Sequence, residues 1–392
     1  MKKFNPRIIL FIAAAAFILL GMASPSLVEK LDLSLEGLYR DVVSLDPAAF
    51  TNFTAKIDDT ADFLRYRNWL LDLDSVKENF LGTRVVFSDD TTVVKADSGN
   101  LLGFLISTPP TVENVQPTVN NIKRIQSIAE KNGAFFLCCT VVENTTYENL
   151  PPNILGYDEE YYQMTLAELE KADVPTMSTA QVFEELGLTG NEIFFKTDHH
   201  WTPNAGFYVS GAICSELQER YGFEYNPEYA DLNHYKVETY PNCFLGSLGK
   251  KVGKYFTDSQ LDDFDLITPL FETSFVKEIP CRNSVISGSF YDTMLYPRYL
   301  SKDYYTVNMY ATYSGGDFRL QKITNNNHPD GETIVIISTS YGCVVTPFLA
   351  VHAKELHIID DREGSYPSGE RVDLEEYFQS VQPDYVIVLF ST

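Results

Sequence analysis

The chain has 392 residues, which is long for one domain but not clearly two, and its 44% hydrophobic content is enough for a substantial core. Its 54 acidic and 30 basic residues give a net charge of -24, and no basic stripe interrupts this balance. Nucleic acid is therefore excluded as a partner, because its phosphate backbone would be repelled.

The first 25 residues have the pattern of an export signal. Three basic residues, Lys2, Lys3 and Arg7, precede the apolar run 8–23. A cleaved signal and a retained anchor both fit, and we favour a signal-anchor with its positive residues inside. The rest of the chain is then expected outside the cytoplasm, tethered to the membrane through residues 1–25, or secreted if that segment is cleaved.

Residues 26–114 are expected to form a lead-in with a small antiparallel β element in the turn-rich stretch 81–104. From about residue 115, strands and helices alternate. We expect helices at 120–133, 159–172, 180–187, 203–221 and 373–382, and strands at 134–144, 174–179, 332–339, 355–361 and 384–392. This alternation predicts an α/β domain over 115–392, with a parallel central sheet and helices on both faces.

Residues 223–330 interrupt the alternation and contain 12 of the chain's 24 tyrosines. We interpret this segment as a large insertion between core elements. Its aromatic side chains would be ordinary core or β-structure, or they would line a sugar-binding groove, since an aromatic face suits the apolar side of a pyranose.

None of the six cysteines belongs to a CxxC pair, so a zinc knuckle is not expected. Cys138 and Cys139 are adjacent in a predicted strand, where their side chains point to opposite faces. Buried free thiols are the default expectation, and a disulfide among the other cysteines stays open.

The stretch KTDHHWTPNAG, residues 196–206, places an acid and two histidines just before the helix that Thr202 is expected to cap. In an extended backbone Asp198 and His200 lie on the same side, and His199 faces away. A carboxylate beside an imidazole holds its tautomer and stabilises the imidazolium that forms when it takes a proton. Such a pair is expected to activate a nucleophile.

The candidate nucleophile is Ser340. It follows the apolar run 334–337 and lies at the carboxyl edge of the predicted sheet, where α/β folds build their sites. Serines at strand ends and structural Asp-His pairs are also common, so spacing alone leaves a structural role open. No metal site is expected from Asp198, His199 and His200, because adjacent residues of a strand cannot all face one ion.

The KTDHHWTPNAG motif resembles the signature of the DHHW family of exported bacterial proteins. That family is similar to the alginate O-acetylation proteins, whose core resembles the SGNH hydrolase fold. Weaker parts of the same resemblance are FLGSLGKKVG (244–253), ISTSYG (337–342) and HIIDDR (357–362), so it covers most of the chain. The resemblance implies an SGNH hydrolase-like three-layer α/β fold that carries acyl-enzyme chemistry.

By this resemblance Asp198 orients the base, His200 is general base and acid, and Ser340 is the nucleophile. Thr339 stands where related sequences often carry an aspartate. Backbone N–H groups for an oxyanion are expected from two segments, Tyr341 or Ser340 and Gly246 or Ser247.

Three further side chains near these motifs are interpreted individually. Trp201 is expected to be a packing residue rather than a substrate platform, and His199 a structural hydrogen-bonder rather than a ligand. Arg362 would form a local ion pair with Asp361, or it would hold an anionic sugar.

Two functions follow from this reading. The first is a serine acyl transferase or esterase that acts on O-acetyl groups of a cell-envelope or exported polysaccharide without a cofactor. By resemblance, its acyl group would come from a membrane-bound O-acyltransferase. The alternative is a catalytically inactive envelope-glycan-binding protein that keeps the fold, which Thr339 and the tyrosine-rich segment 223–330 favour.

Overall fold

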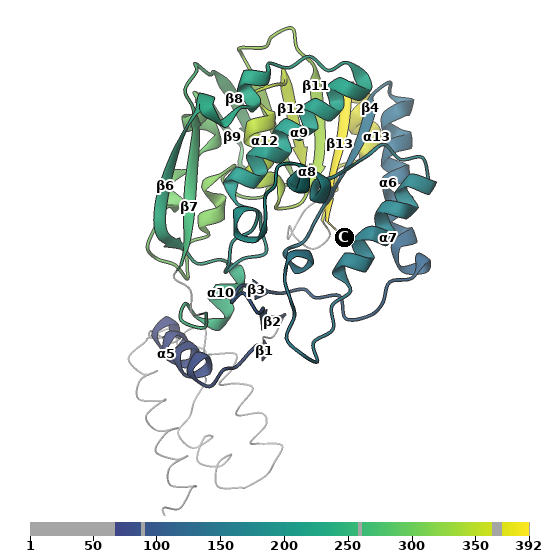
Figure 1. Ribbon diagram of the computed structural model, residues 1–392. Coiled ribbons are helices and arrows are strands. Elements are labelled where there is room, and N and C mark those ends of the chain that lie inside the picture. The colour runs from purple at the N-terminus through teal and green to yellow at the C-terminus, as the bar shows by residue number, and fades with distance from the viewer. Residues whose placement is uncertain (1–66, 88–90, 258–260, 363–370, 392) are drawn as a thin grey trace, which may run out of the picture. The chain divides into compact units, whose positions relative to one another are not determined.

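The computed structural model describes residues 67–392, except 88–90, 258–260, 363–370 and 392 (Figure 1). The chain divides into two units, residues 1–78 and 79–392, and helix α5, Arg67–Phe80, begins in the first. The predicted membrane segment, residues 1–25, lies outside the described residues. Within the described ranges, no helix is both long enough and apolar enough to cross a membrane.

An eight-stranded sheet forms the centre of the second unit, in the order β5-β4-β13-β11-β12-β10-β8-β9. In that order the strands are Thr176–Ser178, Phe135–Val141, Tyr385–Ser391, Thr333–Ser338, Glu355–Ile359, Leu320–Asn325, Phe275–Ile279 and Ser284–Gly288. The first five strands in this order, β5, β4, β13, β11 and β12, are parallel. Strands β10, β8 and β9 continue the sheet in antiparallel pairing.

The predicted all-parallel sheet is therefore wrong in one respect, because the sheet is mixed. The antiparallel strands all come from the segment 223–330, which the sequence suggested was an insertion. Strand β10 alternates between buried and half-exposed residues, whereas β11 is buried along nearly its whole length. Alternating burial is typical of antiparallel strands and continuous burial of parallel ones. Two of the side chains that β10 buries, Gln321 and Asn325, are polar, so its sequence does not show this alternation as a hydrophobic pattern.

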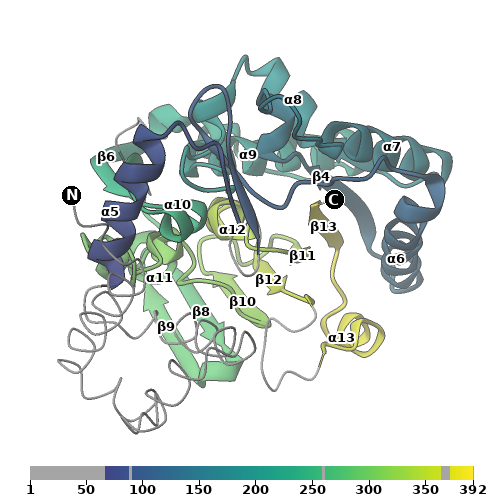
Figure 2. The ribbon, with the colours of Figure 1, turned by 90° about the horizontal axis from the view of Figure 1, so that it is seen from below.

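Helices cover both faces of the sheet, as predicted. They are α6 (Val112–Lys131), α7 (Asp158–Lys171), α8 (Thr179–Glu185), α9 (Pro203–Tyr221), α12 (Gly342–Leu349) and α13 (Leu374–Val381). The apolar side chains of α6 and α13 pack against one face, and those of α8, α9 and α12 pack against the other. Figure 2 shows α9 and α12 on one side of the row of strands and α13 on the opposite side.

Alternation along the buried strands decides which side chain enters which core. Cys138 of β4 joins the cluster under α6 and α13, and its neighbour Cys139 joins the cluster under α9 and α12. The two thiols thus point to opposite faces, as predicted. All six cysteines lie among the described residues and all are free, with Cys281 exposed and Cys243 half-buried.

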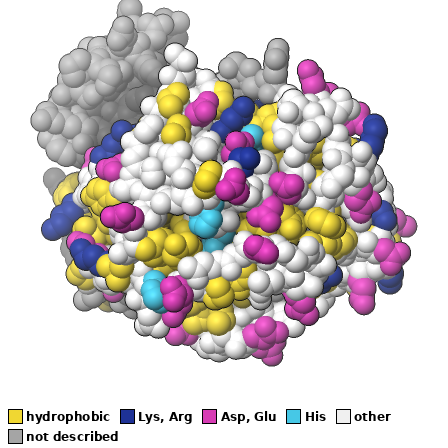
Figure 3. All heavy atoms as spheres, turned by 90° about the horizontal axis from the view of Figure 1, so that it is seen from above, with side chains coloured by type: hydrophobic (Ala, Val, Ile, Leu, Met, Phe, Trp, Pro, Cys, Tyr) yellow, Lys and Arg dark blue, Asp and Glu magenta, His cyan; other side chains and the backbone are white. Residues whose placement is uncertain are grey.

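Smaller elements lie outside the main sheet. Strands β1 (Val85–Phe87), β2 (Thr92–Lys95) and β3 (Leu101–Leu102) form the predicted antiparallel element. Strands β6 (Tyr235–Phe244) and β7 (Asp262–Pro269) pair with each other, and two short helices are α10 (Ser247–Val252) and α11 (Phe290–Met294). On the face that Figure 3 shows, acidic side chains are scattered among apolar ones and a few Lys and Arg.

Helix α9 begins and ends where its sequence predicts. The Thr202 hydroxyl accepts the Ala205 N–H at 3.2 Å, and Gly222 ends the helix with φ +81°. The helix then crosses α12 closely, because a Cβ added to Gly206 would lie 2.5 Å from the Val344 carbonyl oxygen. This close crossing places the loop that precedes α9 beside the turn that precedes α12.

Candidate active site

The Asp-His-His loop is a turn rather than a strand. Phe194 and Trp201 form an isolated antiparallel bridge, and the Phe195 N–H donates to the His200 carbonyl at 3.3 Å. The chain therefore reverses direction between these residues. The extended backbone assumed from the sequence is wrong, although Asp198 and His200 do meet as predicted.

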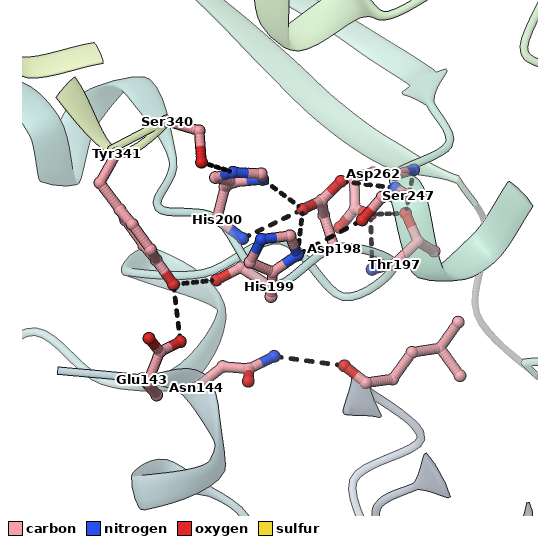
Figure 4. A network of polar contacts seen from close by, with 12 residues as sticks. Glu143, Asn144, Thr197, Asp198, His199, His200, Ser247, Asp262, Ser340 and Tyr341 are labelled. Carbon is pink, nitrogen blue, oxygen red and sulfur yellow. Dashed lines mark hydrogen bonds and ion pairs between the residues drawn. The ribbon is translucent and has the colours of Figure 1, made fainter. Parts of the chain in front are cut away.

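The three predicted catalytic residues form a continuous hydrogen-bonded chain (Figure 4). His200 Nδ1 lies 2.6 Å from Asp198 Oδ1, and His200 Nε2 lies 2.7 Å from Ser340 Oγ. A carboxylate can only accept, so Nδ1 carries the ring proton and Nε2 is left to accept the proton of the serine hydroxyl. This is the geometry that a serine nucleophile and its base require.

Asp198 is held from several sides. Its Oδ1 also accepts the His200 backbone N–H at 3.1 Å, and its Oδ2 accepts the Ser247 N–H at 2.5 Å. A Cβ on Gly246 would lie 2.3 Å from Asp198 Cβ, so only glycine allows this approach. The loop before α10 thus fixes the orientation of the carboxylate.

A second carboxylate supports the same loop. Asp262 of β7 accepts the Lys196 N–H at 2.7 Å, and it accepts the Thr197 N–H at 3.0 Å and the Thr197 hydroxyl at 2.6 Å. The Thr197 hydroxyl oxygen in turn accepts the Gly246 N–H at 2.8 Å. Asp262 therefore holds the backbone of residues 196–197 directly and, through the Thr197 hydroxyl, the backbone of Gly246.

These contacts change the role of the two residues expected at an oxyanion. The Gly246 N–H donates to Thr197 and the Ser247 N–H donates to Asp198, so both amides are engaged in orienting the acid. The Ser247 hydroxyl lies 3.3 Å from His199 Nδ1. The sequence motif FLGSLG is thus explained by support of Asp198.

The electrostatics of the loop favour an ionised acid and a neutral neighbouring histidine. Burial alone would raise the pKa of Asp198, but the charge and hydrogen bond of His200, with His199 and the Ser247 N–H, bring it well below its usual range. Burial and the charge of His200 lower the pKa of His199 to about 4, against the opposing effect of Asp198. His199 is therefore neutral at pH 7.

Ser340 lies in a strand-turn-helix, between the end of β11 at Ser338 and the start of α12 at Gly342. The turn is closed by the Gly342 N–H, which donates to the Thr339 carbonyl at 2.9 Å. The Thr339 hydroxyl is buried without a hydrogen-bond partner among the described residues. Because Asp198 already serves His200, the Asp-His-Ser chain is complete without an acid at position 339.

The side chain of Tyr341 leads away from Ser340 to a half-buried acid, Glu143. Its hydroxyl lies 2.8 Å from Glu143 Oε2 and 2.9 Å from the His199 carbonyl oxygen. A phenol has one proton, so both contacts are hydrogen bonds only when Glu143 is protonated and donates to the tyrosine. Burial raises the pKa of Glu143 to about 7, although its bond to Tyr341 and the charge of His200 oppose the rise.

Aromatic rings enclose the imidazole of His200. The Tyr310 ring stacks on it with centroids 4.4 Å apart, and the Tyr341 ring lies 5.3 Å away. Trp201 is fully buried and packs edge-on against Tyr341 at 4.9 Å and Phe183 at 5.5 Å. These contacts fit the packing role predicted for Trp201 and fix the plane of the His200 ring.

Arg362 pairs with different acids from the one predicted. Its Nε lies 2.9 Å from Asp360 Oδ1, and its Nη2 lies 2.9 Å from Asp317 Oδ2, whereas Asp361 lies 3.6 Å from Arg319. The charge of Arg362 contributes to the lowered pKa of His199. Arg362 is therefore a partly exposed, acid-paired cation close to the site.

The turn also brings together the side chains of Asp198, His199 and His200, which were not expected to form a metal site. One ligand atom each of Asp198, His199 and His200 lies within 4.8 Å of the others. The strand argument against this grouping is thus wrong, because the backbone is not extended. An ion would nevertheless compete for Asp198 Oδ1 and His200 Nδ1, which already bond each other, so the residues fit proton transfer better than metal binding.

Three residues near the site were not singled out from the sequence. Glu143 follows β4 at the same carboxyl edge as Ser340, so the rule that identified the serine could have found it. Tyr310 belongs to the tyrosine-rich segment, but nothing in its neighbouring sequence marks it. Phe104, described below, comes from the lead-in, and only its backbone conformation in the structure reveals it.

The mixed-sheet α/β fold is similar to that of SGNH hydrolase-like proteins. Residues 147–248 match the family model for the SGNH hydrolase-like domain of acetyltransferase AlgX. This match includes the Asp-His-His loop and the segment that orients Asp198.

Solved structures agree on the fold. Bacillus cereus PatB1 with a sulfonyl adduct is similar with a TM-score of 0.62 and 20% identity, covering 78% of this chain and 96% of its own. A DHHW family protein from Eubacterium siraeum is similar with a TM-score of 0.55 and 19% identity, covering 78% and 92%. No curated protein matches the chain. The predicted resemblance to the DHHW family and to the SGNH-like alginate acetylation proteins is confirmed.

Proposed function

We propose that the protein is a serine acyl transferase or esterase that acts on O-acetyl groups of a cell-envelope or exported polysaccharide. The observation that carries the proposal is the unbroken chain from Asp198 through His200 to Ser340, with contacts of 2.6 and 2.7 Å. The match of residues 147–248 to an acetyltransferase domain model supports the acetyl group as cargo. The predicted export signal supports a substrate outside the cytoplasm.

The reaction has two halves. His200 Nε2 takes the hydroxyl proton as Ser340 Oγ attacks the acetyl carbonyl, and Asp198 stabilises the imidazolium. When the tetrahedral intermediate collapses, the bond to the donor oxygen breaks, and His200 returns the proton to that oxygen. An acceptor sugar hydroxyl, or water, then gives its proton to His200 and attacks the acetyl-serine, which regenerates Ser340.

The oxyanion is bound at the start of α12. The N–H groups of Ser340 and Tyr341 precede the first helical residue, Gly342, where the helix dipole favours negative charge. Gly246 and Ser247 do not bind the oxyanion, since their N–H groups donate to Thr197 and Asp198 of the Asp-His-His loop. A membrane-bound O-acyltransferase as donor belongs to the same proposal.

The proposal is tested by turnover of a chromogenic acetyl ester. The full-length chain should release p-nitrophenol from p-nitrophenyl acetate, and Ser340→Ala and His200→Ala should abolish the release. Ser287→Ala, which alters an exposed serine of β9, is the matched control and should keep full activity. Equal turnover by Ser340→Ala and the unchanged chain would remove the mechanism.

A further inference from the structure

One exposed aromatic residue near the site has a strained backbone. Phe104 is 59% exposed and has φ +61°, in the left-handed region that bulky residues rarely adopt. Such strain persists only where the surroundings enforce it, and it gathers at functional sites. In this conformation the phenyl ring lies largely in solvent.

The backbone that carries Phe104 is tied to the catalytic loop. The Leu101 N–H of β3 donates to the Lys196 carbonyl at 2.7 Å, and the Leu101 carbonyl accepts the Asn144 side-chain N–H at 3.2 Å. Leu248 of α10 lies against Gly103. The backbone that precedes Phe104 is thus held by the segment that carries Asp198, by α10 and by the segment that follows β4.

This attachment places the ring next to the reacting groups. Phe104 meets His199 edge-on with centroids 5.2 Å apart, and the rings of His199 and His200 lie 3.9 Å apart. His200 in turn bonds Ser340 at 2.7 Å. One imidazole therefore separates the exposed phenyl ring from the base.

We propose that Phe104 is a platform on which a pyranose ring of the glycan substrate stacks beside the His200–Ser340 pair. An exposed phenyl face suits the C–H face of a pyranose, and its large contact area needs few ordered torsions. The site requires a sugar hydroxyl, or its acetyl ester, to reach Ser340, so a platform next to His199 lies where the rest of that sugar must be. This inference rests on the proposed function and adds the class of ligand group that the site holds.

The first test measures binding without turnover. The full-length Ser340→Ala protein is examined by saturation-transfer-difference NMR with two probes, the tetraoses of β-1,4-linked glucose and of β-1,4-linked N-acetylglucosamine. We expect ring-proton signals from at least one tetraose, a roughly tenfold weaker affinity when Phe104→Ala is added, and recovery with Phe104→Trp. Phe87→Ala, which removes an 83% exposed phenylalanine from β1, is the matched control and should bind like its parent.

The second test compares esters with and without a sugar ring. The ratio of kcat/KM for glucose pentaacetate to that for triacetin, an acyclic acetate ester, should fall roughly tenfold in Phe104→Ala and recover in Phe104→Trp. Phe87→Ala should leave the ratio unchanged. An equal loss of kcat/KM on both esters would mean that Phe104 contributes to acyl-group binding or to folding, and it would overturn the platform proposal.

The outcomes separate the two proposals. Binding of neither tetraose, or binding that Phe104→Ala does not weaken, overturns the platform even if Ser340 turns over esters. Phe104-dependent binding in a chain without Ser340-dependent turnover keeps the platform and removes the acyl transferase.

Discussion

Replacing Asp198 by Asn should disable the base while keeping the shape of the site. The structure gives each carboxylate oxygen a donor, His200 Nδ1 at 2.6 Å on Oδ1 and the Ser247 N–H at 2.5 Å on Oδ2. An amide has only one acceptor oxygen. If that oxygen faces Ser247, the amide NH2 faces His200 Nδ1, and the ring proton must move to Nε2, where it blocks acceptance of the Ser340 proton.

The opposite orientation of the amide is also unfavourable, because its NH2 would then face the Ser247 N–H, donor against donor. We therefore expect kcat to fall about 10⁴-fold, as for a base held in the wrong tautomer, which corresponds to about 5 kcal/mol of lost transition-state stabilisation. The assay is p-nitrophenyl acetate turnover at pH 7, with circular dichroism to show that the variant is folded.

The matched control is Asp263→Asn. Asp263 is exposed and accepts the Asn242 N–H, away from the triad, so this variant should keep kcat within about twofold. A loss of less than tenfold in Asp198→Asn would refute the reasoning, since it would mean that His200 does not depend on this carboxylate for its tautomer.

Two further predictions concern the support of the triad. Glu143→Gln should stabilise the fold at pH 8 by up to about 3 kcal/mol, and this difference should vanish near pH 4 in urea unfolding. In the folded protein the pKa of Glu143 is raised to about 7, above its value in the unfolded chain, so the wild type loses stability as the pH rises from that unfolded-chain value through 7. A gain in stability that does not depend on pH would contradict this reasoning. Gly246→Ala should lower kcat/KM at least tenfold, because its Cβ would lie 2.3 Å from Asp198 Cβ, while Gly331→Ala, whose nearest contact is 3.4 Å, should not; equal activity of the two would show that the acid loop adapts freely.

Much of the fold could be predicted because its signals are local. Apolar strands and capped helices indicated the α/β alternation, and α9 spans the predicted range 203–221 with Thr202 as its N-cap. The antiparallel part of the sheet, three of its eight strands, was not predicted, because β10 pairs with β8 and β12 over long sequence separations and only β8 and β9 form a local hairpin. Strand propensity does not determine which sheet a strand joins.

The candidate site was predicted only where chemistry follows from adjacency in sequence. Asp198 and His200 are two residues apart, and Ser340 follows a buried strand, so residue type and position pointed to them. The N–H groups of Gly246 and Ser247 were assigned to an oxyanion because the sequence cannot show that they reach Asp198 first. Phe104 could not be predicted, since its role depends on a positive φ and on a contact across the fold.

The most direct test of the account is to trap the acyl-enzyme. The full-length chain would be mixed with p-nitrophenyl acetate, quenched in acid within the first turnovers, and its acetylated peptide mapped by mass spectrometry. The account predicts one acetyl group on Ser340, formed much more slowly in His200→Ala and absent in Ser340→Ala. Turnover with no acetyl on Ser340, or an acetyl that forms equally fast without His200, would contradict the proposed mechanism.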